Sequence, residues 1–117
     1  MENVERVKAK LIVEGANGPT TPEAEKVLHQ KGVVIISDIL ANAGGVTMSW
    51  IEWANNRMGN IMTDQEALER LDRIMAQNFH RVFSEWQKKY STYPMRIAAY
   101  VIAIDRAVRA MKLRGWI

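Results

Sequence analysis

Two short apolar runs, joined by a loop rich in glycine and proline and by one helix, constrain the fold of this chain most. The first run predicts a strand near residues 11–14, and the second, at 33–36, is β-branched throughout, as expected for a strand covered on both faces. Between them, Thr21 can cap a helix, Pro22 suits its first position and Gly32 can end it. A strand, a helix and a strand in this order predict a parallel crossover, so the predicted fold class is α/β.

The remaining sequence predicts helices. The segment 46–55 is apolar nearly all round, which predicts a helix buried on several sides. Thr63 and Glu66 form a capping-box pattern at the start of a long helix, and Pro94 separates this helix from a last one that ends near Gly115. The apolar stripe expected on the last helix consists of Ile97, Val101, Ile104, Val108 and Met111.

Size and charge limit the classes of protein to consider. The 117 residues suit one domain, in which an α/β part, 1–55, and a helical part, 56–117, form one structural unit. Lys and Arg number 16 against 13 Asp and Glu, a net charge of +3 that does not by itself predict a nucleic-acid partner. No apolar run approaches the ~18 residues that a membrane helix needs, and the start lacks a signal-peptide pattern. We therefore expect no membrane partner and a cytoplasmic location.

Several common chemistries are not predicted. The sequence has no Cys, which excludes thiol chemistry, and His29 and His80 lie far apart, so no metal site is expected. The motifs of phosphate loops, dinucleotide fingerprints, zinc proteases and serine hydrolases are missing. Four basic residues of the last helix are interpreted as a solvated face rather than a nucleic-acid interface, namely Arg106, Arg109, Lys112 and Arg114.

Two loops are the candidate binding elements. One contains Asn17 and Gly18 after the first predicted strand, and the other, at 42–45, contains Asn42 and Gly44 after the second. Each loop alone is also compatible with a structural turn. Because the carboxyl ends of neighbouring parallel strands lie at the same edge of a sheet, where α/β proteins bind ligands, we expect the two loops to form one rim.

One helix face continues from the second loop. Asn42, Val46, Ser49 and Trp53 have the spacing of residues on a single helical face. This pattern predicts a binding wall, with Asn42 at its mouth, Val46 as apolar surface and Ser49 as hydroxyl donor. The alternative for Ser49 is a hydrogen bond to the carbonyl oxygen four residues back in its own helix.

Three parts of these segments carry a family resemblance. Residues 12–24, IVEGANGPTTPEA, residues 38–47, DILANAGGVT, and then Ser49 resemble glutamate dehydrogenase, of the Glu/Leu/Phe/Val dehydrogenase superfamily. The resemblance covers essentially the whole chain, and Ser49 distinguishes it from the leucine and phenylalanine relatives. It implies the C-terminal segment of such an enzyme: 1–55 as the last part of a Rossmann-like dinucleotide-binding domain and 56–117 as a helical extension packed on it.

The resemblance also implies roles for particular residues. In the family, the residues matching Asn17 and Asn42 contact the nicotinamide end of NAD or NADP, and Gly18 and Gly44 belong to the same cofactor-binding loops. The residues matching Val46 and Ser49 line the glutamate pocket, where the serine hydroxyl reaches the side-chain carboxylate. The family's catalytic lysine and aspartate motifs and its glycine-rich pyrophosphate loop are not in this sequence, so no catalytic residue is assigned.

Three functional hypotheses remain open from the sequence. The first is a part of an NAD(P)-dependent glutamate dehydrogenase, which converts L-glutamate to 2-oxoglutarate and ammonia, with the remainder of the enzyme or a homo-oligomer as partner. The second is a stand-alone, non-catalytic assembly or regulatory module that uses its apolar helices to bind a partner. The third is a nucleic-acid binder that uses the last helix. The sequence does not choose between NAD and NADP.

Overall fold

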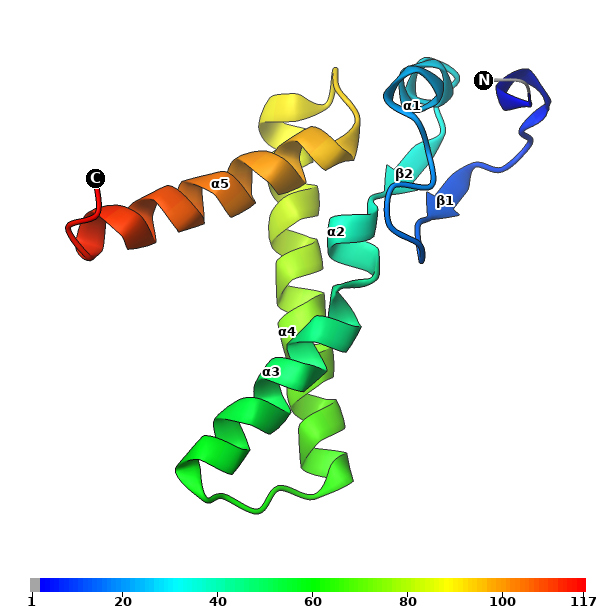
Figure 1. Cartoon of the computed structure of the whole chain (residues 1–117). Coiled ribbons are helices and arrows are strands. Elements are labelled where there is room, and N and C mark those ends of the chain that lie inside the picture. The colour runs from blue at the N-terminus through cyan, green and yellow to red at the C-terminus, as the bar shows by residue number, and fades with distance from the viewer. Residues whose placement is uncertain (1–2) are drawn as a thin grey trace.

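The computed structural model describes residues 3–117, which form a small parallel sheet followed by long helices (Figure 1). Strands β1 (Leu11–Val13) and β2 (Val34–Ile36) pair in parallel, with Ile12 opposite Ile35. Helix α1 (Pro22–Gln30) connects them, as the sequence predicts. A 3-10 turn, Val4–Arg6, precedes the sheet.

Helix α1 begins and ends at the residues that the sequence indicates. The Ala24 N–H donates to Thr21 Oγ1 over 3.3 Å, and Pro22 occupies the first turn, where its missing N–H is not needed. Gly32 leaves the helix with φ of +79°, a conformation that side chains disfavour. The inner face of α1 packs on the sheet in a cluster of Val4, Leu28, Val33 and Ile35, bordered by Val7, Ile12, Ala24 and Val27.

The prediction of a buried first strand is wrong for this chain. The side chains of Leu11 and Val13 are 54% and 58% exposed, and only Ile12 turns towards α1. The physical reason is that α1 covers one face of the sheet only. On the other face, a cluster of buried residues that includes Leu40, Val82 and Met95 is bordered by Ile36 of β2, and within residues 3–117 no residue of β1 borders it. The second strand comes closer to the expectation, because Ile35 is buried and its neighbours are half-buried.

Most of the second predicted loop, 42–45, lies in the first turn of a helix. Helix α2 (Asp38–Ala41) follows β2 directly, and α3 (Ala43–Met58) begins after Asn42, so Gly44 lies in the first turn of α3 rather than in a loop. The N–H of Ala41 donates to the Ser37 carbonyl over 2.8 Å.

Helix α3 is not buried on several sides, contrary to the sequence prediction. Ile51 and Asn55 are buried, whereas Val46 is 71%, Trp50 50% and Trp53 60% exposed. Helix α4 packs against one side of α3, and the other side faces outwards (Figure 1).

Helices α4 (Asp64–Glu85) and α5 (Met95–Leu113) agree with the predicted helical pair. The capping box is present, because Thr63 N donates to Glu66 Oε2 over 2.8 Å and Glu66 N donates to Thr63 Oγ1 over 3.3 Å. A π-helical turn, Trp86–Tyr90, continues α4, and Pro94 precedes α5.

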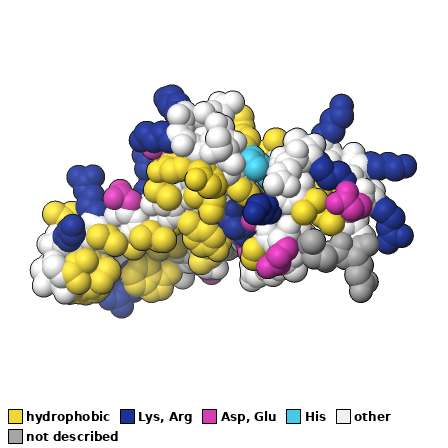
Figure 2. All heavy atoms as spheres, turned by 90° about the horizontal axis from the view of Figure 1, so that it is seen from above, with side chains coloured by type: hydrophobic (Ala, Val, Ile, Leu, Met, Phe, Trp, Pro, Cys, Tyr) yellow, Lys and Arg dark blue, Asp and Glu magenta, His cyan; other side chains and the backbone are white. Residues whose placement is uncertain are grey.

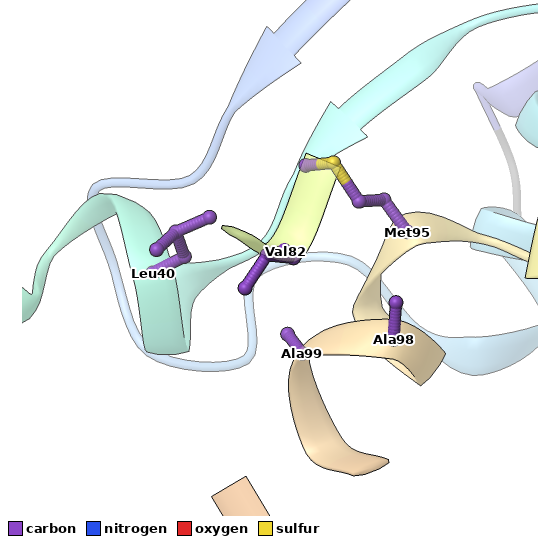
Figure 3. Packing of buried hydrophobic residues seen from close by; sticks show 5 residues of the cluster. All are labelled: Leu40, Val82, Met95, Ala98 and Ala99. Atoms are coloured by element: carbon purple, nitrogen blue, oxygen red, sulfur yellow. The ribbon is translucent and has the colours of Figure 1, made fainter. Parts of the chain in front are cut away.

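The buried face of α5 differs from the predicted stripe. Its first turns contribute Met95, Ala98 and Ala99 to a core with Leu40 of α2 and Val82 of α4 (Figure 3). The rest of α5 extends away as an arm, which leaves Ile97, Val101 and Ile104 40%, 40% and 59% exposed. Figure 2 shows hydrophobic side chains gathered along this arm. Within residues 3–117, no helix is both long and apolar enough to cross a membrane.

Candidate functional site

The two loops predicted to form one rim do meet in the structure. Asn17 follows β1, Asn42 follows the short helix after β2, and Asn42 Nδ2 donates a hydrogen bond of 2.6 Å to Asn17 Oδ1. We call Asn17 and Asn42 the asparagine pair. Both amides stand at the carboxyl end of the parallel strands, the edge at which α/β proteins bind ligands.

The two candidate glycines occupy different settings. Gly18 has φ of +58°, which L side chains rarely adopt, and its N–H donates to Asp38 Oδ2 over 2.8 Å. Gly44 lies two residues beyond Asn42, and nothing stands within 4 Å of the position that a Cβ would take. The backbone beside the asparagine pair is therefore held by a hydrogen bond at Gly18, and at both glycines the Cβ position has nothing within 4 Å.

Val46, Ser49 and Trp53 lie on the outward side of α3, with Asn42 at the start of the helix. Ser49 Oγ donates to the Gly45 carbonyl over 3.2 Å, which is the intrahelical alternative considered from the sequence. The hydroxyl is exposed. To donate to a ligand carboxylate, it would have to give up its hydrogen bond to the Gly45 carbonyl.

Two hollows lie away from the asparagine pair. Two cavities of about 410 Å³ lie near the turn between α3 and α4, with Asn60, Ile61 and Met62 in both linings. On the outward side of α3, Val46 borders a hollow of about 310 Å³ together with Thr47, Trp50 and Ile74.

A buried ionic cluster beneath the rim escaped the sequence analysis. Arg96 of α5 contacts three carboxylates: Nη2 pairs with Glu14 after β1, Nε lies 3.0 Å from Glu25 of α1, and Nη1 lies 2.5 Å from Asp38 of α2. The side chain of Arg96 is 13% exposed, and those of its partners are 1% to 11% exposed. These four residues, the Arg96 cluster, join the last helix to both strand ends.

Hydrogen bonds and charges shift the pKa values of two members of the Arg96 cluster, Asp38 and Arg96. The Gly18 N–H, together with the Ile39 N–H and the Arg96 guanidinium, lowers the pKa of Asp38 against the opposing effect of burial. Burial also opposes the charged form of Arg96, but the Glu25 charge and hydrogen bonds to Asp38 and Glu14 outweigh it and raise the pKa of Arg96. Asp38 and Arg96 are therefore both charged at neutral pH.

The sequence contains a feature at three of the four cluster residues, but none of these features alone predicts an ionic cluster. Glu14 interrupts an apolar strand at its end, Asp38 comes two residues after the next strand, and Arg96 lies between apolar residues after Pro94. Each is compatible with an exposed charge. Their contact joins positions as far apart as 82 residues, which local patterning does not report.

The lowered pKa of Asp38 predicts a pH-dependent contribution to stability. Because the folded pKa lies below the unfolded value of about 4, the contribution is present above that pH and is lost as the pH falls through the folded pKa. Urea midpoints of the wild type should therefore fall more steeply below about pH 4 than those of Asp38→Asn. Asp105→Asn removes an exposed carboxylate from α5 and controls for net charge. Parallel midpoint curves for wild type and Asp38→Asn would contradict this assignment.

The fold and the rim define the class of protein. A parallel sheet whose strand ends carry amides beside a helix start is typical of α/β proteins that bind ligands at that edge. The family model described as Glutamate/Leucine/Phenylalanine/Valine dehydrogenase matches residues 1–115. The chain therefore belongs to this family of amino-acid dehydrogenases.

Individual relatives are glutamate dehydrogenases. The chain is 58% identical to glutamate dehydrogenase of Aeropyrum pernix, over 99% of the chain and 28% of the relative. It is 52% identical to the NADP(+)-dependent glutamate dehydrogenase of Pyrobaculum calidifontis, over 99% of the chain and 27% of the relative.

Two solved structures share the fold. The glutamate dehydrogenase of Peptoniphilus asaccharolyticus matches 99% of the chain and 29% of its own length, with a TM-score of 0.89 and 40% identity. The hetero-hexameric glutamate dehydrogenase of Thermus thermophilus, in a leucine-bound form, matches 97% of the chain and 27% of its own length, with a TM-score of 0.88 and 29% identity. The chain thus spans less than a third of the length of these relatives.

Proposed function

We propose that this chain is the C-terminal part of an NAD(P)-dependent glutamate dehydrogenase and supplies one wall of its cofactor and substrate cleft. The complete enzyme would convert L-glutamate to 2-oxoglutarate and ammonia, with the catalytic lysine and aspartate in the remainder. The observation that carries the proposal is the hydrogen-bonded asparagine pair at the strand-end rim, in a chain 58% identical to a glutamate dehydrogenase over 99% of its length.

The asparagine pair fits the nicotinamide end of the cofactor. An asparagine side chain offers both N–H donors and a carbonyl acceptor, which match the complementary groups of a carboxamide. The mutual hydrogen bond of 2.6 Å holds Asn17 and Asn42 in place, and it leaves each amide further hydrogen-bonding capacity. NAD or NADP supplies the hydride acceptor when bound, and this chain's part is to orient its nicotinamide end. The dinucleotide phosphates need a glycine-rich loop that this sequence does not contain.

Val46 and Ser49 suit the substrate side of the same cleft. Val46 offers apolar surface, and Ser49 offers a hydroxyl beside it on the outward side of α3. On substrate binding, the Ser49 hydroxyl, which donates to the Gly45 carbonyl over 3.2 Å, would donate instead to the side-chain carboxylate of glutamate. A hydrogen bond to a charged group is the stronger of the two, so the exchange favours binding.

The exposed apolar surfaces support the view that the chain functions with a partner. Trp50 and Trp53 on α3 and Ile104 on α5 are at least half exposed. Exposed apolar areas of this kind mark surfaces that pack against other protein. The partner in this proposal is the remainder of the dehydrogenase, within a homo-oligomer. The same surfaces favour the second candidate function, a non-catalytic assembly module.

The experiment is reconstitution. The chain is mixed or coexpressed with the portion of the Aeropyrum pernix enzyme outside the matched region, and glutamate-dependent reduction of NAD and NADP is followed. Activity is expected only when both parts are present. A complex without activity would support the assembly module, and the absence of both activity and complex would overturn the proposal.

Ser49→Ala tests the substrate wall in the reconstituted enzyme. We expect kcat/KM for glutamate to fall about tenfold or more, as for the loss of a hydrogen bond to a charged group, with little change in the KM of the cofactor. Ser91→Ala, on the exposed turn before α5, is the matched control. Equal kinetics of the two variants would remove Ser49 from the substrate site.

A further inference from the structure

Asp38 contacts both loops that carry the asparagine pair. Its Oδ2 accepts a hydrogen bond of 2.8 Å from the N–H of Gly18, the residue after Asn17. Its main-chain carbonyl accepts a bond of 3.0 Å from the N–H of Asn42. A shift of Asp38 would therefore move the two asparagines relative to each other.

Arg96 in turn fixes the side chain of Asp38. The Nη1 atom of Arg96 lies 2.5 Å from Asp38 Oδ1, which leaves Oδ2 for Gly18. Arg96 Nη2 holds Glu14 Oε2, and this same oxygen accepts the main-chain N–H of Asp38 over 3.0 Å. The guanidinium thus holds Asp38 both directly and through Glu14, at a site where little solvent screens the charges.

The geometry points to Arg96 and Asp38 as positioning residues that set the spacing of the asparagine pair. Neither side chain would touch the reacting atoms. The Arg96 guanidinium joins the first turn of α5 to the ends of both strands. The helical part of the chain thereby helps to set the positions of Asn17 and Asn42. The kinetic part of this inference rests on the proposed function, whereas its structural part does not.

Glu25 provides a control within the same cluster. It receives Arg96 Nε over 3.1 and 3.0 Å and is buried like Asp38, but it belongs to α1, and within residues 3–117 its side-chain oxygens accept hydrogen bonds from Arg96 alone. Glu25→Gln and Asp38→Asn each remove one buried carboxylate from Arg96 at nearly constant volume. A merely stabilising role predicts equal effects of the two variants on the rim, and a positioning role predicts an effect of Asp38→Asn alone.

The first measurement uses this chain alone and follows the side-chain amide signals of Asn17 and Asn42 by NMR. Gly18 and Arg96 donate to different oxygens of Asp38, so in Asp38→Asn one of these two donors faces an NH2 group instead of an acceptor. We expect the Asn42 amide signal to move towards that of a solvated asparagine and its contact with Asn17 to be lost. Glu25→Gln should leave both signals in place. If Asp38→Asn does not fold, Arg96→Lys, which keeps the charge but loses the planar fork, is expected to shift the same signals.

The second measurement uses the reconstituted enzyme. Asp38→Asn is expected to raise the KM of the cofactor about tenfold, with a smaller change in kcat, and Glu25→Gln to change neither by more than about twofold. Amide signals unaltered in Asp38→Asn and Arg96→Lys, or moved equally by Glu25→Gln, would overturn the inference. Wild-type protein that fails to reconstitute would count against the proposed function only, because the amide signals test the positioning role without it.

Discussion

Arg96→Leu is expected to lower the free energy of unfolding by about 3–5 kcal/mol, the range measured when one partner of a buried ion pair is removed. The substitution keeps apolar volume but leaves Glu14, Glu25 and Asp38 buried together without a cation. Their mutual repulsion and their lost solvation act in the same direction. Urea unfolding of the chain, followed by circular dichroism, measures the change.

Arg106→Leu is the matched control for this prediction. Arg106 lies on the exposed side of α5 and donates one hydrogen bond of 3.1 Å to Asn78. Its removal should change the free energy of unfolding by less than about 1 kcal/mol, as for surface charges in general. Adding Glu14→Gln and Glu25→Gln to Arg96→Leu should recover part of the loss, because fewer carboxylates are then unpaired. Similar unfolding midpoints for Arg96→Leu and Arg106→Leu would show that the cluster is not a buried ionic centre.

Met95→Ala is expected to lower the free energy of unfolding by about 2–5 kcal/mol, the range for removing a large apolar side chain from a packed core. Met95 is 2% exposed and belongs to the buried cluster that joins α2, α4 and α5, together with Leu40 and Val82 (Figure 3). The truncation leaves a cavity at the junction between the α/β part and the helices. Met58→Ala makes the same chemical change at a side chain that is 67% exposed and should stay within about 0.5 kcal/mol of wild type. Equal midpoints for the two methionine variants would contradict the assignment of this core.

Sequence patterns predicted those features of the fold that depend on interactions between residues close together in the chain. Thr21 and Thr63 were recognised as caps because a cap depends on residues three positions away. The meeting of Asn17 and Asn42 was also predicted, because parallel strands bring their carboxyl ends to one edge and the helix between them fixes their order. The roles of these residues with a cofactor and a substrate stay predictions.

Features that depend on distant parts of the molecule were not predicted. The burial expected for Leu11 and Trp53 requires covering layers that residues 3–117 do not provide, so apolar character alone misplaced both side chains. The apolar stripe predicted on α5 is also wrong, because this helix packs on the core through its small residues Ala98 and Ala99. Helix α2 is too short for periodicity to reveal. The Arg96 cluster depends on the three-dimensional path of the chain and has no local pattern.

The parallel sheet has a consequence for handling the chain in isolation. With β1 paired only to β2 in the described residues, each strand turns one row of main-chain donors and acceptors outwards. Within residues 3–117, both edges of this two-stranded sheet are therefore unpaired, and an extended segment of another molecule can add to either edge as a further strand. Lys8 and Lys10, just before β1, put positive charge beside one flank and discourage this growth. We therefore expect the solubility of the separate chain to decrease at high salt, where that repulsion is screened.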